Sequence, residues 1–338
     1  MSHRRPTKPA HRRIARTPTH TPTRAHADAH AGDRDVAPAQ IARLARLAWC
    51  ACLLVAVGGT VRADENLFGY VKGAEPLPRG AVEVYQTLTS RTDKGAGHYG
   101  ALDSETEVEY GFTDRLSGYA GFRAMAIDTH DLRIDGYLPA DRDTGLRVAG
   151  IEAALKYNFL SPARAPLGVA TVFELSLGRL DRHSGQDKDT ISIEHLLLLQ
   201  RYLLDGRLIL VANVGYEATR ARRFPIADLP AGFDWPTTPE MELALKLGFG
   251  VSYRFRPGWF LGAEAFHDRE YETEVGLERW SWQAGPTLHY GGRRWWTTLT
   301  WLPQLEGGGE SYAGQTDTNL HLVEKTKHEL RFKLGFNF

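Results

Sequence analysis

The charged residues of this chain that could do chemistry recur at every second position of apolar segments. Between Met241 and Tyr253, Glu242 and Lys246 alternate with leucine, phenylalanine and valine. Side chains of a β-strand point alternately to its two faces, so such a segment has one apolar and one polar face. A charge that faces lipid costs about 2–4 kcal/mol at the bilayer midplane, so in a membrane barrel these charges would face the lumen. This parity predicts one set of lumen-facing charges: Glu107, Glu109, Arg123, Glu152, Lys156, Glu174, Glu242, Lys246, Glu264, Glu329, Arg331 and Lys333.

Glu194, Glu217 and Asp268 follow the same parity. A lumen with charges of both signs predicts one of two roles. The charges either form a Glu–Lys/Arg network that fills the lumen and stiffens the wall, or they select small solutes in a water-filled conduit. Barrels of about twelve strands lie between the small filled barrels and the wide porins, so both roles stay open.

Hydrolytic chemistry is the alternative, because some outer-membrane barrels are phospholipases or proteases. His183 and Ser184 are a close His–Ser pair, but neighbouring strand residues face opposite ways, and the pair departs from the His-x-Ser spacing of the barrel phospholipase. Asp103, Asp128, His130 and Asp131 resemble the acidic and His–Asp pairs at the rim of barrel proteases. Isolated loop acids are more often simply solvated, so we expect no enzyme.

Metal and cofactor sites have little support in the sequence. The eight histidines after residue 63 are scattered, without a His-x-x-x-His pair. Asp135, Asp141 and Asp143 are loop acids without a full calcium-binding loop. No glycine-rich loop precedes a helix. We therefore expect no metal site and no bound cofactor.

The elements that must position the charges are segments of about ten to thirteen residues with period-two character. They predict twelve strands, over 81–91, 104–112, 116–127, 146–158, 168–178, 190–203, 207–219, 240–254, 259–269, 279–290, 295–303 and 326–338.

The connections between these strands alternate in length. Those after even-numbered strands are tight, such as Gly111-Phe-Thr-Asp114 and Leu204-Asp-Gly-Arg207, whereas those after odd-numbered strands are mostly longer and more polar. Bacterial single-chain barrels have this asymmetry, together with an even number of strands, whereas a β-sandwich has no reason for it. The sequence therefore predicts an all-β fold, a transmembrane antiparallel up-and-down β-barrel with both mature termini in the periplasm.

The last stretch, 326–338, has Leu330, Phe332, Leu334, Phe336 and Phe338 on one face. It resembles the closing strand of outer-membrane barrels, in which a terminal aromatic residue is the usual assembly signal. Phe338 is therefore the expected signal for the barrel-assembly machinery.

The part before the barrel divides at about residues 40 and 63. Residues 1–40 are rich in Arg, His, Pro, Thr and Ala and predict a disordered basic extension. Residues 41–63 predict a cleaved signal peptide, because the apolar run after Arg46 is too short to span a membrane and Val61-Arg-Ala63 fits a cleavage site. Both cysteines, Cys50 and Cys52, lie in this segment. Residues 64–338 are the predicted barrel domain.

The net charge of zero conceals an acidic barrel. Residues 1–63 hold 11 of the 41 basic and 3 of the 41 acidic residues, which leaves 30 basic and 38 acidic residues for 64–338. We expect outer-membrane lipid as the partner of this domain, small solutes as its possible ligands, and no nucleic acid.

In total pattern the chain resembles the proteobacterial outer-membrane barrels that are grouped as a domain of unknown function and often labelled transporters. The resemblance rests on Asn66-Leu-Phe-Gly-Tyr70, the turn Gly111-Phe-Thr-Asp-Arg115, Tyr157-Asn-Phe-Leu-Ser-Pro162 and the terminal Phe338. It implies the fold and the cell outer membrane of a Gram-negative bacterium, and it carries no catalytic residues. The predicted function is a porin-like passage for small solutes; the alternatives are a phospholipase- or protease-like barrel enzyme and a filled barrel for structure or surface recognition.

Overall fold

The computed structural model describes residues 66–134, 141–227, 229, 231, 235–273 and 276–338. All of them belong to the second of two compact units, Ala56–Phe338. The predicted basic extension, the signal peptide with its two cysteines, and Asp135 lie outside the described residues. None of the described residues forms a helix long and apolar enough to cross a membrane.

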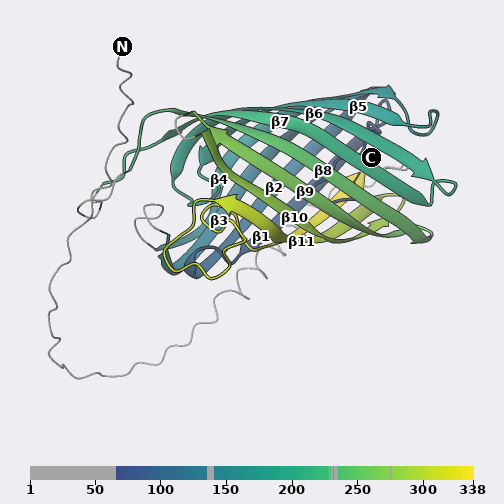
Figure 1. The fold of residues 1–338 in the computed structure, drawn as a ribbon. Coiled ribbons are helices and arrows are strands. Elements are labelled where there is room, and N and C mark those ends of the chain that lie inside the picture. The colour runs from purple at the N-terminus through teal and green to yellow at the C-terminus, as the bar shows by residue number, and fades with distance from the viewer. Residues whose placement is uncertain (1–65, 135–140, 228, 230, 232–234, 274–275) are drawn as a thin grey trace, which may run out of the picture. The chain divides into compact units, whose positions relative to one another are not determined.

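Twelve antiparallel strands close into a barrel, as the sequence predicts (Figure 1). Neighbours in sequence pair with one another, and β1 pairs with β12 from Glu83 opposite Asn337 to Thr92 opposite His328. The strands are β1 (Val82–Thr92), β2 (Ala96–Thr113), β3 (Leu116–Arg133), β4 (Arg142–Leu160), β5 (Gly168–Leu180), β6 (Asp187–Leu203), β7 (Leu208–Arg223), β8 (Glu240–Arg256), β9 (Trp259–Glu272), β10 (Gly276–Gly291), β11 (Trp295–Gly309) and β12 (His328–Asn337).

The barrel has two different ends. At the turn end, connections of two to seven residues follow β2, β4, β6, β8 and β10, and Val82 exchanges backbone hydrogen bonds with Phe338. At the loop end, the connections 224–239 and 310–327 are much longer, and the connection 181–186 has six residues. Two connections predicted to be long, those after β1 and β9, are only 93–95 and 273–275.

Most strands continue beyond their predicted ends on the loop side. The segment 128–145, predicted as a polar loop, is strand up to Arg133 and again from Arg142. Apolar alternation is required only where one face meets lipid, whereas backbone pairing continues wherever two strands run side by side. The alternation therefore marks the membrane-spanning part of each strand rather than its whole length.

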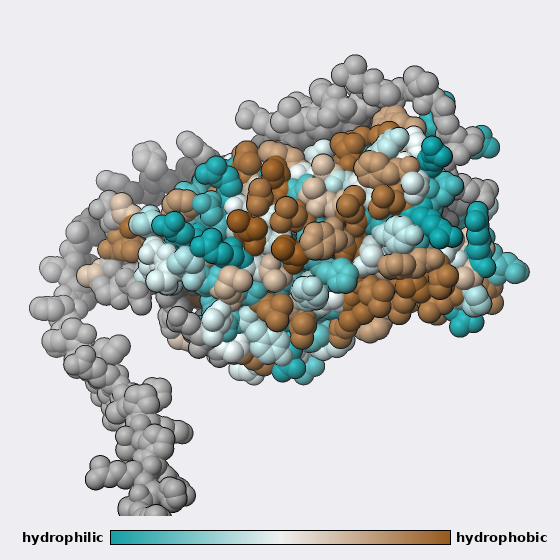
Figure 2. Space-filling view, turned by 90° about the horizontal axis from the view of Figure 1, so that it is seen from above, coloured by the Kyte–Doolittle hydropathy of each residue, from teal (hydrophilic) through white to brown (hydrophobic). Residues whose placement is uncertain are grey.

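The outer face of the strands is apolar. In β8, the exposed side chains include Met241, Leu243, Leu245, Phe249 and Val251, between buried or half-buried neighbours. Figure 2 shows such apolar side chains gathered over the middle of the face in view, with hydrophilic side chains toward its ends. An apolar surface of this extent around a closed barrel is typical of strands that face lipid.

Residues 66–77 lie inside the barrel instead of leading into it from outside, and we call them the N-terminal plug. The sequence predicts no strand here, since the first predicted strand begins at residue 81. Leu67, Phe68 and Val71 pack against Ile209, Val211 and Phe260 of the wall. Ala74 packs in a second cluster against Ala154, Ala170, Val172, Leu196 and Leu198. The plug thus buries its apolar side chains on two patches of the inner wall.

Candidate functional site: the plugged lumen

One carboxylate on β9 holds the first part of the plug. Glu264 accepts hydrogen bonds from the backbone N–H groups of Gly69, Tyr70 and Val71 at 2.7, 2.8 and 3.0 Å. The hydroxyl of Thr300 donates a fourth, at 2.8 Å. Successive backbone N–H groups that converge in this way bind anions well, so the plug chain folds around the carboxylate.

Side-chain amides hold the second part of the plug as a neighbouring strand would. The amide of Asn213 on β7 accepts from the N–H of Lys72 at 2.7 Å and donates to the carbonyl of Lys72 at 2.8 Å. Gln200 on β6 accepts from the N–H of Ala74 at 2.6 Å, and Asn158 on β4 donates to the carbonyl of Ala74 at 2.8 Å. The backbone N–H and carbonyl groups of Lys72 and Ala74 are thereby satisfied without a sheet.

Space for the plug depends on two glycines on the inner face of β8. A Cβ atom at Gly250 would lie 2.7 Å from the ring of Phe68, and one at Gly248 would lie 3.3 Å from a methyl group of Val71. Both glycines have ordinary φ values, so the requirement is for room and not for an unusual backbone.

A cavity of about 500 Å³ occupies the lumen beside the plug. The plug, the inner wall and the loop residues Asp181, Arg182 and His183 line it. Eleven of the twelve predicted lumen charges line this cavity; the twelfth, Glu264, binds the plug. Glu194, Glu217 and Asp268 line it as well.

The wall formed by β5 to β10 carries paired charges. Lys246 on β8 contacts both Glu194 on β6 and Glu217 on β7. Lys188 lies 2.9 Å from Glu242, and Arg279 lies 2.6 Å from Glu270. Each of these four carboxylates has a cation that offsets part of the cost of leaving water.

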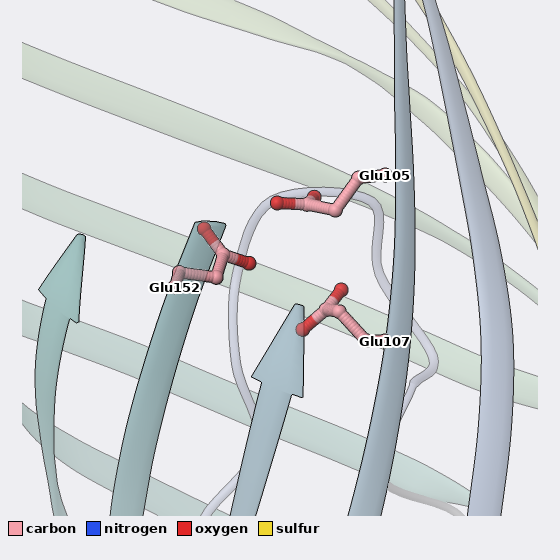
Figure 3. Close-up of side chains that lie close together, drawn as sticks. All are labelled: Glu105, Glu107 and Glu152. Atoms are coloured by element: carbon pink, nitrogen blue, oxygen red, sulfur yellow. The ribbon is translucent and has the colours of Figure 1, made fainter. Parts of the chain in front are cut away.

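The wall formed by β2 to β4 carries an excess of carboxylates. Glu105, Glu107 and Glu152 point toward one another, with carboxylate oxygens within 4.8 Å (Figure 3). Arg123 lies 3.5 Å from Glu152, and the hydroxyl of Tyr85 donates to Glu107 at 2.6 Å. Glu105 is absent from the predicted set, although the parity of Glu107 and Glu109 already places it on the inner face.

At the loop end, residues 181–186 turn inward over the cavity. Arg91 donates to the carbonyl of Arg182 at 2.7 Å, and Tyr99 and Lys94 donate to the carbonyl of His183 at 3.0 and 3.3 Å. Burial, together with the nearby cations Lys94, Arg279 and Arg91, holds the pKa of His183 well below its usual value. His183 is therefore a neutral part of an inward-folded loop at pH 7.

The residues considered for hydrolysis fall at three separate places: the inward loop, the lumen and the outer face. Ser184 accepts a hydrogen bond from the N–H of Gln186 and belongs to the inward loop. Asp103 faces the lumen, where it accepts two hydrogen bonds from Arg91, at 2.8 and 2.9 Å. Asp128 and His130 face outward, 3.0 Å apart. Asp103 and Asp128 therefore project from opposite faces of the wall and do not form one acidic pair.

A smaller chamber of about 220 Å³, which we call the vestibule, lies nearer the loop end. Its lining holds Arg223, Trp235 and His321 together with six acidic side chains, namely Asp181, Glu240, Glu272, Glu278, Glu310 and Glu324. Asp181 lines both chambers, so they are adjacent.

A match to a family model shows to which protein family the chain belongs. Residues 60–338 match the model described as "Family of unknown function (DUF6662)". The chain belongs to this family. The resemblance to outer-membrane barrels of unknown function is thereby confirmed. No curated protein sequence matches the chain.

A similar solved structure shows the fold of this family member to be that of an outer-membrane β-barrel. The COG4313 outer membrane channel from Pseudomonas putida F1 has a TM-score of 0.52 and 11% identity, over 78% of this chain and 98% of that one. The β-domain of the Bordetella autotransporter BrkA has a TM-score of 0.48 and 13% identity, over 77% and 100%. The KdgM porin in complex with oligogalacturonate has a TM-score of 0.40 and 10% identity, over 76% and 99%.

Proposed function

We propose that this protein is a gated conduit for small polar solutes across the outer membrane of a Gram-negative bacterium. The observation that carries the proposal is the charge-lined cavity of about 500 Å³ inside a barrel whose plug is held to the wall by hydrogen bonds, packing and an ion pair. A lumen that served only as a filled scaffold would need no such space. A similar structure of the same fold is described as an outer membrane channel, which agrees with this role.

The orientation follows from the connections. In bacterial barrels the short turns face the periplasm, so the turn end, with Val82 and Phe338, faces the periplasm in our proposal. The plug enters the lumen from this end, since Gly80 donates to the carbonyl of Gly111 beside the turn from β2 to β3. Outer-membrane lipid then surrounds the apolar face, and the barrel-assembly machinery would recognise Phe338.

We propose transport rather than hydrolysis because the charged side chains that face inward gather in the lumen. His183 and Ser184 are held in an inward loop, and Asp128 and His130 face outward. The second candidate is a filled scaffold. It is favoured by the same plug and by the ion pairs of the wall around Lys246.

Uptake by proteoliposomes tests the proposal. The full chain, exported and purified from membranes, is compared with a variant that lacks 66–77, and both are checked for a heat-modifiable barrel. We expect faster entry of glycine and arabinose into vesicles with the shortened protein. Equal and negligible entry with both folded proteins would contradict a conduit and favour the filled scaffold.

A further inference from the structure

The path through the barrel is strongly acidic. Thirteen acidic and ten basic side chains line the lumen cavity, and six acidic side chains and one arginine line the vestibule. With Asp181 counted once, the two chambers hold 18 acidic and 11 basic groups. The excess of seven acids nearly equals the excess of eight in all of residues 64–338. Fixed charge of one sign in a narrow lumen concentrates ions of the other sign and excludes its own.

One cation of the path differs from the others because the plug, and not the wall, supplies it. Lys72 extends its ammonium group from the plug toward β3 and β5. The ammonium donates to the hydroxyl of Tyr119 at 2.8 Å and lies 3.3 Å from the carboxylate of Glu174. It also lies 5.2 Å from the centre of the Tyr119 ring. The carboxylate and the hydroxyl oxygen are two acceptors that suit the donors of an ammonium ion.

The wall half of this site is preorganised. The hydroxyl of Tyr119 itself donates to Glu174, which fixes both groups relative to each other. Asn213 of the wall holds the backbone of Lys72 with two hydrogen bonds while the plug is docked. Because Lys72 is part of the plug, it leaves the site when the plug undocks. Withdrawal of the plug would leave Tyr119 and Glu174 in place, facing the cavity that they line.

We infer that Lys72 occupies the binding position of the solute, and that the solutes of this barrel are small organic cations with a primary ammonium group. This inference rests on the proposed conduit and names its substrate class. The plug lysine acts as a tethered competitor: while it is bound, the site is closed, and a free amine takes its place once the plug leaves. Anionic solutes are disfavoured throughout the path by the surplus of carboxylates.

Calorimetric binding of propylammonium chloride to the purified full-length protein tests this inference. We expect Lys72→Ala to bind propylammonium at least about tenfold more tightly than the wild type, because Lys72 no longer competes. The gain should vanish in Lys72→Ala/Glu174→Gln. Lys327→Ala is the matched control, since Lys327 pairs with Asp317 in the loop 310–327 and does not line the cavity.

Several outcomes separate the possibilities. Binding of propylammonium no better than that of potassium chloride at equal ionic strength would overturn the ammonium site and leave a general cation preference. Equal binding to the wild type and Lys72→Ala would overturn the competitor role. Lys72→Met, which keeps most of the aliphatic stem, repeats the test if the alanine variant does not give a heat-modifiable barrel. Amine binding without any vesicle uptake would support the ammonium site and refute the conduit. Uptake without amine binding would support the conduit and refute the ammonium site.

Discussion

Replacement of Glu264 by glutamine should release the plug while leaving the barrel folded. The carboxylate accepts three backbone hydrogen bonds from the plug, and a hydrogen bond to a charged group is worth about 1.5–3 kcal/mol against about 0.5–1.5 for a neutral one. Gly69 donates to one oxygen of Glu264 and Tyr70 and Val71 donate to the other, whereas glutamine keeps one accepting oxygen and replaces the other with a donor. We therefore expect a loss of about 2–4 kcal/mol in plug docking. At 1.36 kcal/mol per factor of ten, the undocked population should rise about 30- to 1000-fold.

Thiol labelling measures this population. Ala74 is fully buried between the plug and the wall, so a cysteine in its place reacts with a bulky maleimide only when the plug undocks. Labelling of Ala74→Cys should accelerate by the stated factor in Ala74→Cys/Glu264→Gln. Glu105→Gln is the matched control, because it removes a carboxylate from the same lumen without touching the plug. Labelling that is equally slow in both Glu264 backgrounds would refute the assignment of Glu264 as the plug anchor.

Three further predictions concern the lumen wall and the loop end. Lys246→Met leaves Glu194 and Glu217 without their cation and should destabilise the barrel by about 3–5 kcal/mol in urea unfolding, against less than about 1 kcal/mol for Lys327→Met. Gly250→Val places a Cβ atom 2.7 Å from the Phe68 ring and should increase vesicle permeability, whereas Gly145→Val, which has open space, should not. Burial and the nearby cations Arg279 and Lys325 lower the pKa of His321 to about 3. As the pH falls, His321 is therefore protonated in the undocked loop before it is protonated in the docked loop. The free energy of docking of the loop 310–327 should therefore be constant above pH 6.5 and fall by up to about 1.4 kcal/mol per pH unit between pH 6.5 and 3. Hydrogen exchange of the loop amides would detect this loss. Unchanged protection across this range would show that His321 is not buried.

The wall of the barrel could be predicted from the sequence because the membrane imposes a local rule. Every strand must present apolar side chains to lipid and polar ones to the lumen, so Glu242, Lys246 and their neighbours reveal both the strand and its inner face. The rule weakens beyond the lipid, which explains why β3 and β4 extend further than predicted.

The contents of the lumen could not be predicted in this way. The plug has no alternation, and its conformation depends on partners distant in sequence, such as Glu264, which is 195 residues from Gly69. The inward turn of 181–186 likewise depends on Arg91 and Tyr99 from other strands. One signal was available: Gly248 and Gly250 stand on the inner face of β8, where a missing side chain indicates that another chain segment approaches closely.

Single-channel current in planar bilayers tests the central claim most directly, with the wild type and Glu264→Gln recorded under a gradient of potassium chloride. We predict long closures in the wild type, a higher open probability in Glu264→Gln, and a reversal potential that favours potassium over chloride. A silent bilayer with Glu264→Gln, in a protein whose plug thiol at position 74 labels rapidly, would show that an undocked plug does not open a path and would contradict the account.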